Sequence, residues 1–376
     1  MSLLRLIAIA RKELLHVVRD PRSLAMAIGM PMLMLLLFGY ALTLDVDRVP
    51  IAVLDRSNSV LSRELISRFA GCRYFSVRLH ASDYDELEKA IDKREVWMAV
   101  VLPEDFARRL DSGRNTTVQL VMDGSDANAA TIALDYAEAV CDNFSERMLF
   151  EALERKGRSW LQPPIDLRAR AWFNEAMKSR HFLVPGLIAV IMMILSALLT
   201  SLTVAREWER GTMERLIATP VRGSELLLGK LTPYFCIGML DVALAVGLGE
   251  FVFKVPLRGN VLLVFGVAAV FLIGTPWLGL LISIVAKNQL MANQLAMVVT
   301  FVPSFLLSGL MFSISNMPWA LQVVTYLVPA RYFVSVMRGI YLKGLGVRML
   351  GLEILLLAIF AALVAILANA AFRRKL

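Results

Sequence analysis

The nearest approach to an ATP-binding motif in this sequence is the stretch GSELLLGKL at 223–231. Gly223 and Gly229 are separated by five residues, and Leu231 follows Lys230. A phosphate-binding loop needs four intervening residues and then Lys followed by Ser or Thr, so that backbone amides hold the phosphates and the hydroxyl holds Mg²⁺. The spacing excludes ATP binding by such a loop. We expect this chain to bind no cofactor of its own.

Other catalytic patterns are also missing from the sequence. The cysteines Cys72, Cys141 and Cys236 show no CxxC spacing and have no neighbouring histidine, which argues against a zinc or redox site. The GxSxG turn of serine hydrolases does not occur. The sequence therefore predicts a protein that is not an enzyme. For Cys72 and Cys141, which we expect outside the cytoplasm, a disulfide and two unpaired buried thiols both stay open.

The densest group of charges is REWERGTMERLIATP, the segment 206–220, with six charged residues in fifteen positions between two apolar runs. Its apolar residues share one face of a short helix, and they are Met213, Leu216 and Ile217. Glu214 and Arg215 lie to the side, and Thr219 before Pro220 should end the helix. An amphipathic helix with both charge signs suits docking to a soluble protein better than docking to anionic lipid.

The composition places the segment in a membrane protein. Hydrophobic residues make up 57% of the chain, and the mean hydropathy is +0.62. The net charge of +8 comes from basic residues that flank apolar runs, a membrane-topology pattern that disfavours nucleic-acid binding. The first apolar run follows five basic residues and is as long as a bilayer is thick, which predicts a retained anchor instead of a cleaved signal peptide.

Six transmembrane helices are predicted from uncharged or nearly uncharged runs of sufficient length. The runs are 23–44, 182–205, 231–249, 259–286, about 290–312 and 354–372. The third contains Asp241, which is costly in a bilayer and is either part of a substrate path or a helix-packing residue. Prolines and glycines after the fifth predict short helices in 313–345 that enter the membrane and return.

Basic residues at both termini and within 206–230 predict that both ends of the chain face the cytoplasm. Arg331, Arg338, Lys343 and Arg348 oppose this orientation, because they fall on the outer side. We expect Arg331 and Arg338 to be anchoring residues that bind helix-end carbonyls or lipid headgroups.

The segment 45–180 is too polar to span a membrane and too long for a simple connection, so it should fold as an extracytoplasmic domain. Four short strands alternate with helical patterns, and the strands are 50–55, 74–79, 96–102 and 117–122. Ser82 and Asp85 suggest a capping box that opens a helix over 82–93, and a long helix is expected over 127–156. The fold class is thus a polytopic α-helical membrane protein with an α/β domain inserted after its first span.

Four stretches of the sequence resemble one family. REWERGTMERLIATPVRGSELLLGK (206–230) resembles the segment between spans two and three of ABC type-2 exporter permeases. RKELLHVVRDPRSL (11–24), FLVPGLIAVIM (182–192) and VPARYFVSVMRGIYLKG (328–344) are similar to its entry helix, the start of its second span and the segment before its last span. The large insert resembles the drug-efflux branch of the family.

The resemblance implies a dimeric inner-membrane permease that exports a drug-like or lipophilic substrate by alternating access. Residues 1–22 would form a cytoplasmic entry helix, and 206–225 would couple to a separate ATPase subunit that holds ATP and Mg²⁺. The implied coupling residues are Arg206, Glu207, Glu209, Arg210, Gly211, Thr212, Met213, Glu214 and Leu216. The second permease subunit would be an identical copy or a related chain, and a periplasmic adaptor with an outer-membrane channel is a further possible partner.

Two other functions remain open from the residues alone. The chain could be an anchored receptor or scaffold whose outer domain binds a ligand, although six spans would then be hard to explain. It could also be a secondary transporter driven by protons through Asp241, which the single central acid and the lack of a visible internal repeat weaken.

Overall fold

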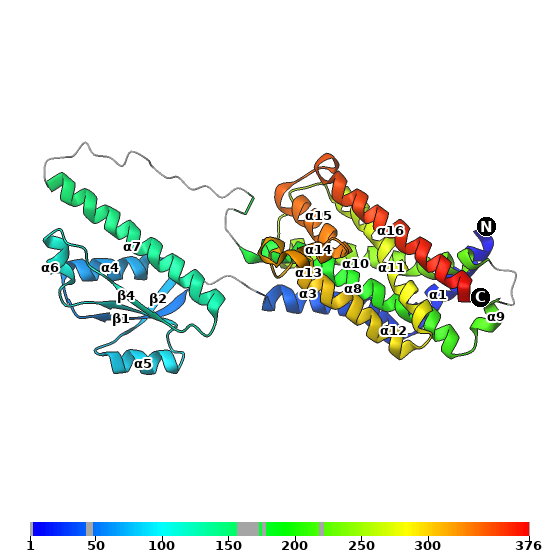
Figure 1. Ribbon diagram of the computed structural model, residues 1–376, viewed down its shortest axis with the longest axis horizontal. Coiled ribbons are helices and arrows are strands. Elements are labelled where there is room, and N and C mark those ends of the chain that lie inside the picture. Colours follow the sequence, from blue (N-terminus) through cyan, green and yellow to red (C-terminus); the bar gives the residue numbers. More distant parts are fainter. Residues whose placement is uncertain (1–2, 43–47, 156–172, 175–177, 218–221, 376) are drawn as a thin grey trace. The chain divides into compact units, whose positions relative to one another are not determined.

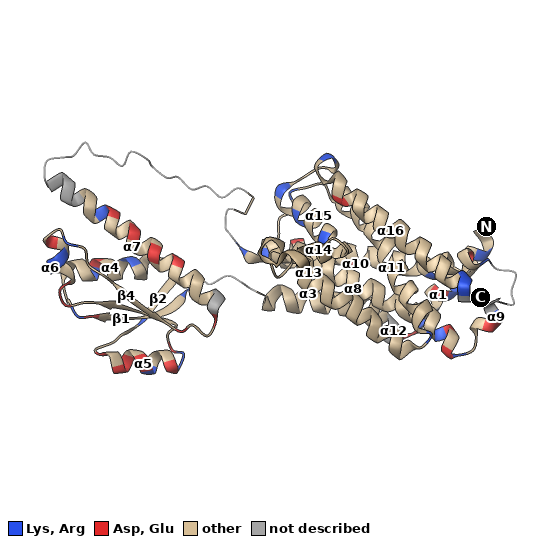
Figure 2. Ribbon diagram, viewed as in Figure 1, with Lys and Arg blue, Asp and Glu red and all other residues tan. Residues whose placement is uncertain are grey.

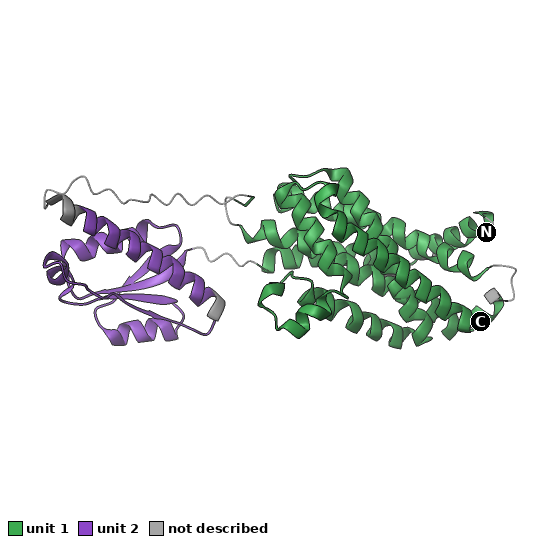
Figure 3. Cartoon of the chain, turned by 45° about the horizontal axis from the view of Figure 1, so that its top comes forward, with its two compact units in different colours: residues 1–43, 170–376 green, residues 44–169 purple. Residues whose placement is uncertain are grey.

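The computed structural model describes residues 3–42, 48–155, 173–174, 178–217 and 222–375. The chain divides into two compact units (Figure 3). The helical unit comprises residues 1–43 and 170–376, and the inserted unit comprises residues 44–169.

The inserted unit is built on a four-stranded mixed sheet with the strand order β2-β1-β3-β4 (Figure 1). Its elements are β1 (Val49–Asp55), α4 (Val60–Gly71), β2 (Phe75–His80), α5 (Tyr84–Asp92), β3 (Met98–Leu102), α6 (Phe106–Asp111), β4 (Gln119–Met122) and α7 (Ala127–Arg155). β1 pairs in parallel with β2 and β3, and β4 is antiparallel to β3. The strands predicted from sequence are confirmed.

Alternation along the strands divides the apolar residues between the two faces of this sheet. Ile51 and Val100 face α4, α6 and α7, and join Phe69 and Phe106 in one core. Ala52 and Ala99, the neighbours of these residues in β1 and β3, point to the opposite face and join Leu87 of α5 in a second core.

The three cysteines of the chain are free thiols.

The cap of α5 differs from the predicted capping box. Asp83, and not Ser82, is the N-cap, and its side chain accepts a hydrogen bond from the backbone N–H of Glu86. The Glu86 carboxylate in turn accepts from the N–H of Ser82 at 2.8 Å. Asp83 and Glu86 have the three-residue spacing that a cap requires, as Ser82 and Asp85 do, so spacing alone could not choose between the pairs. The predicted end of the long helix at residue 156 lies outside the described residues.

The helical unit begins with α1 (Leu3–Arg19), and a second helical stretch follows it from Pro21 to Ala41 with a π-helical turn at Ala25–Gly29 between α2 (Pro21–Leu24) and α3 (Met30–Ala41). The long helices are α8 (Ser179–Glu209), α10 (Gly223–Gly247, continued by a π-helical turn to Val252), α11 (Val261–Ala286) and α16 (Val347–Lys375). The shorter ones are α9 (Met213–Ile217), α12 (Gln289–Ala296), α13 (Val302–Leu307), α14 (Trp319–Thr325) and α15 (Pro329–Lys343). A π-helical turn, Met297–Phe301, joins α12 to α13.

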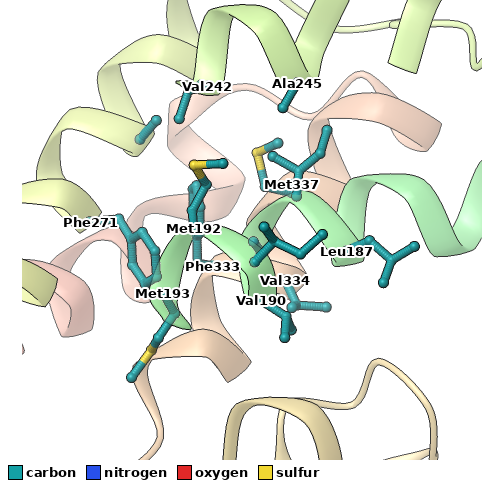
Figure 4. Packing of buried hydrophobic residues seen from close by; sticks show 14 of the residues in the cluster. Leu187, Val190, Met192, Met193, Val242, Ala245, Phe271, Phe333, Val334 and Met337 are labelled. Carbon is teal, nitrogen blue, oxygen red and sulfur yellow. The ribbon is translucent and has the colours of Figure 1, made fainter. Parts of the chain in front are cut away.

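The core of this unit forms around α8, which is buried along most of its length. Leu187, Val190 and Met192 of α8 meet Phe271 of α11 and Phe333 of α15 (Figure 4). The helices α8 and α11 approach closely at Gly279, where a Cβ atom would overlap atoms of Ala197 and Thr200. Small residues at helix crossings permit such backbone contact in membrane bundles.

Among the described residues, five helical segments are long and apolar enough to cross a membrane. They are Ser179–Glu209, Gly223–Val252, Val261–Ala286, Gln289–Leu306 and Val347–Arg374. The predicted first span corresponds to the shorter apolar helix Ala25–Ala41. In 313–345 the chain bends by 81° between α14 and α15, as expected for short helices instead of one straight span.

The two ends of the helical unit carry different elements. Both chain termini and α9 lie at one end, whereas α13, α14 and α15 lie toward the other (Figure 1). The guanidinium of Arg180, at the start of α8, lies 5.5 Å from the ring centroid of Tyr40, at the end of α3. The two points at which the chain leaves for the inserted unit are therefore adjacent.

Candidate functional site

The segment 206–220 begins inside the last turn of α8 and leaves the helix by a glycine turn. Arg210 is the C-cap, and Gly211 has a φ of +66°, in the left-handed region. The N–H of Gly211 donates to the carbonyl of Trp208 at 3.1 Å, and the N–H of Thr212 donates to that of Glu207 at 3.0 Å. These two bonds form a Schellman motif, which favours glycine at the left-handed position. Gly211 thus ends α8 and redirects the chain into α9.

A buried cluster of ion pairs holds this turn against two other helices. The Nζ of Lys230 on α10 lies 2.6 Å from Oε1 of Glu13 on α1 and 3.2 Å from Oε1 of Glu207 on α8. Lys12 reaches the same Glu207 oxygen at 3.3 Å, and the Thr212 hydroxyl donates to the Glu207 carboxylate. The Lys230 side chain is only 2% exposed. We call Lys12, Glu13, Glu207 and Lys230 the ion-pair cluster.

The ion-pair cluster borders a cavity of about 190 Å³. Arg206 and Arg210 also line it, together with Thr203, Thr212 and Tyr234. Four cationic and two anionic side chains therefore surround the cavity. Arg206, Glu207, Arg210 and Thr212, four of the implied coupling residues, are brought together here.

α9 is fixed to the bundle on one side and exposed on the other. Met213 is fully buried and packs in a core that includes Leu227 of α10 and Phe372 of α16. Glu214 and Arg215 are exposed. The side chains of Leu216 and Ile217 and the predicted stop at 219–220 lie outside the described residues.

Glu209 has a partner within its own chain. Its carboxylate accepts hydrogen bonds from the backbone N–H and the side-chain Nε2 of Gln289, at 3.1 and 2.9 Å. Gln289 is the first residue of α12. Glu209 therefore joins the end of α8 to the start of α12, and its carboxylate is not a free docking group.

Asp241 lies inside the bundle on α10, with 4% of its surface exposed. It borders a small gap of about 10 Å³ with Ser196 and Tyr234. Its Oδ1 atom has no hydrogen-bond partner among the described residues. This gap has room for at most about one water molecule, so the arrangement holds no substrate-sized space at Asp241.

Arg338 and Arg331 lie on α15, away from the ion-pair cluster. The guanidinium of Arg338 donates to the carbonyls of Phe182, Gly309 and Leu310 at 3.2, 2.8 and 3.3 Å. Arg331 donates to the Thr325 hydroxyl and lies 3.9 Å from the ring centroid of Tyr326.

Sequence reasoning missed the partners of Glu207. In the sequence, Lys230 fails as a phosphate-loop lysine and counts as a basic residue of 206–230, and Glu13 belongs to the entry helix, so neither is identified as a partner of Glu207. The available signal was the isolated position of Lys230 in an apolar run, since a charge there needs a counter-charge. The identity of that counter-charge, 217 residues away, could not be read locally.

Comparisons with known proteins agree on one family. The model of a family described as ABC-2 family transporter protein matches residues 21–369. Probable multidrug ABC transporter permease YbhS of Escherichia coli K12 is 38% identical over 341 residues, 90% of this chain and 89% of that protein. Probable multidrug ABC transporter permease YbhR of the same strain is 31% identical over 371 residues, 99% of each chain. ABC transporter G family member 20 of Dictyostelium discoideum is 23% identical over 353 residues, which are 92% of this chain and 47% of that protein.

Proposed function

This chain belongs to the ABC-2 family of transporter proteins, and from that membership we propose that it is the permease subunit of an exporter powered by a separate ATPase subunit. ATP and Mg²⁺ would bind to the ATPase. We propose a drug-like or lipophilic substrate, and the names of the two Escherichia coli relatives, both probable multidrug permeases, support the drug-like class. Alternating access would move it out of the cytoplasm or the inner leaflet.

The proposal rests on one observation: α9 is held against the helical bundle on one side and exposes charged residues on the other. Its outward residues, Glu214 and Arg215, are exposed and carry opposite charges, which suits recognition of a complementary protein surface. Its inward residue, Met213, is buried in a core that also contains residues of α10 and α16. Next to it, Thr212 donates to Glu207, and Glu207 pairs with Lys230. A force on α9 would therefore be transmitted to α8, α10 and, through Glu13, α1.

We propose that the end bearing α9 and both termini faces the cytoplasm, where an ATPase subunit would have access to ATP. The helix Ala25–Ala41 then serves as the first of six crossings, because 17 residues reach the lower limit for a membrane span. The bent α14–α15 pair would stay at the opposite side. The chain leaves for the inserted unit near Tyr40 and Arg180, which supports an extracytoplasmic position for residues 44–169.

A second permease subunit completes the proposed transporter. Exposed apolar residues along α12 and the turn after it offer a surface for a related chain or for lipid, and they include Leu290, Met291, Met297 and Val298. In a host with two membranes, the inserted unit could meet a periplasmic adaptor that leads to an outer-membrane channel.

The test is co-purification of the tagged full chain in mild detergent, with associated proteins identified by mass spectrometry. The variant Glu214→Ala/Arg215→Ala removes the exposed charges of α9 and leaves the ion-pair cluster and Glu209 intact. The matched control is Glu88→Ala/Lys89→Ala, an exposed acid–base pair on α5 of the inserted unit.

We expect an ABC ATPase with the wild type and the control, and at least about tenfold less with the α9 variant, since two interfacial charge contacts contribute on the order of 1.5 kcal/mol or more. Equal recovery with the α9 variant would reject α9 as the docking helix. Failure to recover any ATPase with monodisperse wild-type protein would favour the anchored receptor instead.

A further inference from the structure

A second cavity, of about 550 Å³, lies at the end of the helical unit that bears α13, α14 and α15. Arg331 and Arg338 line it from α15, and Phe182, Leu310, Met311 and Ile314 supply apolar surface. This volume falls within the range of small-molecule sites, about 300–1,000 Å³. The cavity is far larger than the gap at Asp241 and is made of different residues from those of the ion-pair cluster.

Among the described residues, no acidic side chain neutralises the charge in this cavity. None of the described residues that line it is acidic, and neither arginine forms an ion pair with a described residue. Arg338 uses three of its five N–H groups on carbonyls, which are dipoles and leave its positive charge unneutralised. Within the described parts of the chain, the Arg331 guanidinium donates one hydrogen bond, to Thr325, which leaves most of its donors available. A half-buried cation without a counter-charge favours binding of an anion.

Arg338 also makes the cavity rigid. By holding the carbonyls of Gly309 and Leu310, it fixes the turn after α13, where Gly309 has a φ of +81°. By holding the carbonyl of Phe182, it ties that turn to the start of α8. A fixed wall lowers the ordering cost of binding.

Exposed aromatic side chains surround the cavity, as is typical of a membrane interface. Phe312, between two lining residues, is 58% exposed, and Trp319 of α14 is 79% exposed. Tyr326, whose ring contacts Arg331, is 59% exposed. Exposed aromatic residues gather at the level of lipid headgroups, where a lipid has both its charge and its acyl chains within reach. Figure 2 shows basic residues on α15 beside these elements.

We propose that this cavity binds an anionic phospholipid, with the phosphate of its headgroup between Arg331 and Arg338 and its apolar part against Met311 and Ile314. Guanidinium groups match phosphate geometry, and anionic headgroups are attracted to such paired basic residues. The binding does not require transport or an ATPase, so its test stands apart from that of the proposed function.

The experiment is a lipid titration of the full chain in a neutral detergent, followed by native mass spectrometry. Phosphatidylglycerol is compared with phosphatidylcholine of the same acyl chains and with inorganic phosphate. Arg331→Gln removes the freer guanidinium. Ser335→Phe fills the cavity from an exposed lining position without a change in charge. Arg348→Gln, at an exposed arginine outside the cavity, is the control with the same charge change.

We expect phosphatidylglycerol to bind at least about tenfold more tightly than phosphatidylcholine, because both lipids carry a phosphate but the choline ammonium cancels the net negative charge and is repelled by the two arginines. Arg331→Gln and Ser335→Phe should each remove that preference, and Arg348→Gln should keep it. Equal binding of the two lipids, or equal behaviour of Arg331→Gln and Arg348→Gln, would overturn the proposal. If inorganic phosphate binds as tightly as phosphatidylglycerol, the ligand of the cavity is a free anion and the lipid proposal is wrong. If Ser335→Phe keeps the preference for phosphatidylglycerol, the lipid binds outside this cavity.

Discussion

Replacement of Lys230 by methionine tests the ion-pair cluster most directly. Methionine is an unbranched side chain of similar length, so the main change is the loss of the ammonium group. The wild-type Nζ lies 2.6 Å from a Glu13 oxygen and 3.2 Å from a Glu207 oxygen. The Glu13 and Glu207 side chains are only 8% and 14% exposed. The variant therefore leaves two buried carboxylates without the cation that they share.

The expected magnitude follows from burial. Removal of one partner from a buried ion pair costs about 3–5 kcal/mol, and we expect Lys230→Met to lower the free energy of unfolding by this amount. Lys12 is the matched control, because it contacts the same Glu207 oxygen but is 62% exposed. Lys12→Met should cost less than about 1 kcal/mol, since solvent screens an exposed pair.

The assay is denaturant unfolding of the purified chain in detergent, applied as a double-mutant cycle of Lys230→Met and Glu13→Gln. Glu13→Gln should restore much of the stability lost in Lys230→Met, because it neutralises the buried carboxylate that has lost its ammonium partner, whereas Glu207 keeps its contact with Lys12. The reasoning is refuted if Lys230→Met costs no more than Lys12→Met. It is equally refuted if the two mutations add within about 0.5 kcal/mol, which is the behaviour of independent sites.

Two further predictions test other parts of the fold. Gly279→Ala should lower the free energy of unfolding by about 1–3 kcal/mol, because the added Cβ would overlap Thr200 of α8. The control is Gly266→Ala on the same helix, where the added Cβ meets open space. It should be neutral or stabilising by up to about 1 kcal/mol. Equal thermal midpoints for the two variants would contradict the close helix crossing. Burial raises the pKa of the Cys141 thiol above its ordinary value of 9.0, and the negative charges of Asp142 and Glu138 raise it further. A Cys72→Ser/Cys236→Ser chain leaves Cys141 as the one thiol that can be labelled. Its rate of maleimide labelling should still increase at pH 9, since the thiolate is the reacting form, and a plateau below that pH would be inconsistent with the burial of Cys141.

The sequence by itself determined the local features of both units. The four strands of the inserted unit were predicted within two residues of their observed starts, because short runs of β-branched and apolar residues indicate a strand without distant information. The long helices were also predicted from local sequence, because a helix that crosses a membrane needs an uninterrupted apolar run of about 20 residues. The order of the strands and the cap at Asp83 needed the structure, because several pairings and caps fit the same spacing.

The candidate site was only partly available to sequence reasoning. The segment 206–220 stood out by its charge density, and its short helix followed from the spacing of its apolar residues. Only the tertiary structure decided what each charge contacts: Glu207 and Glu13 share Lys230, Glu209 holds Gln289, and Glu214 stays exposed. The physical reason is that ion pairs are short-range contacts between residues far apart in the chain. Which charges become buried together depends on how α1, α8 and α10 pack, and no local pattern of residues records that packing.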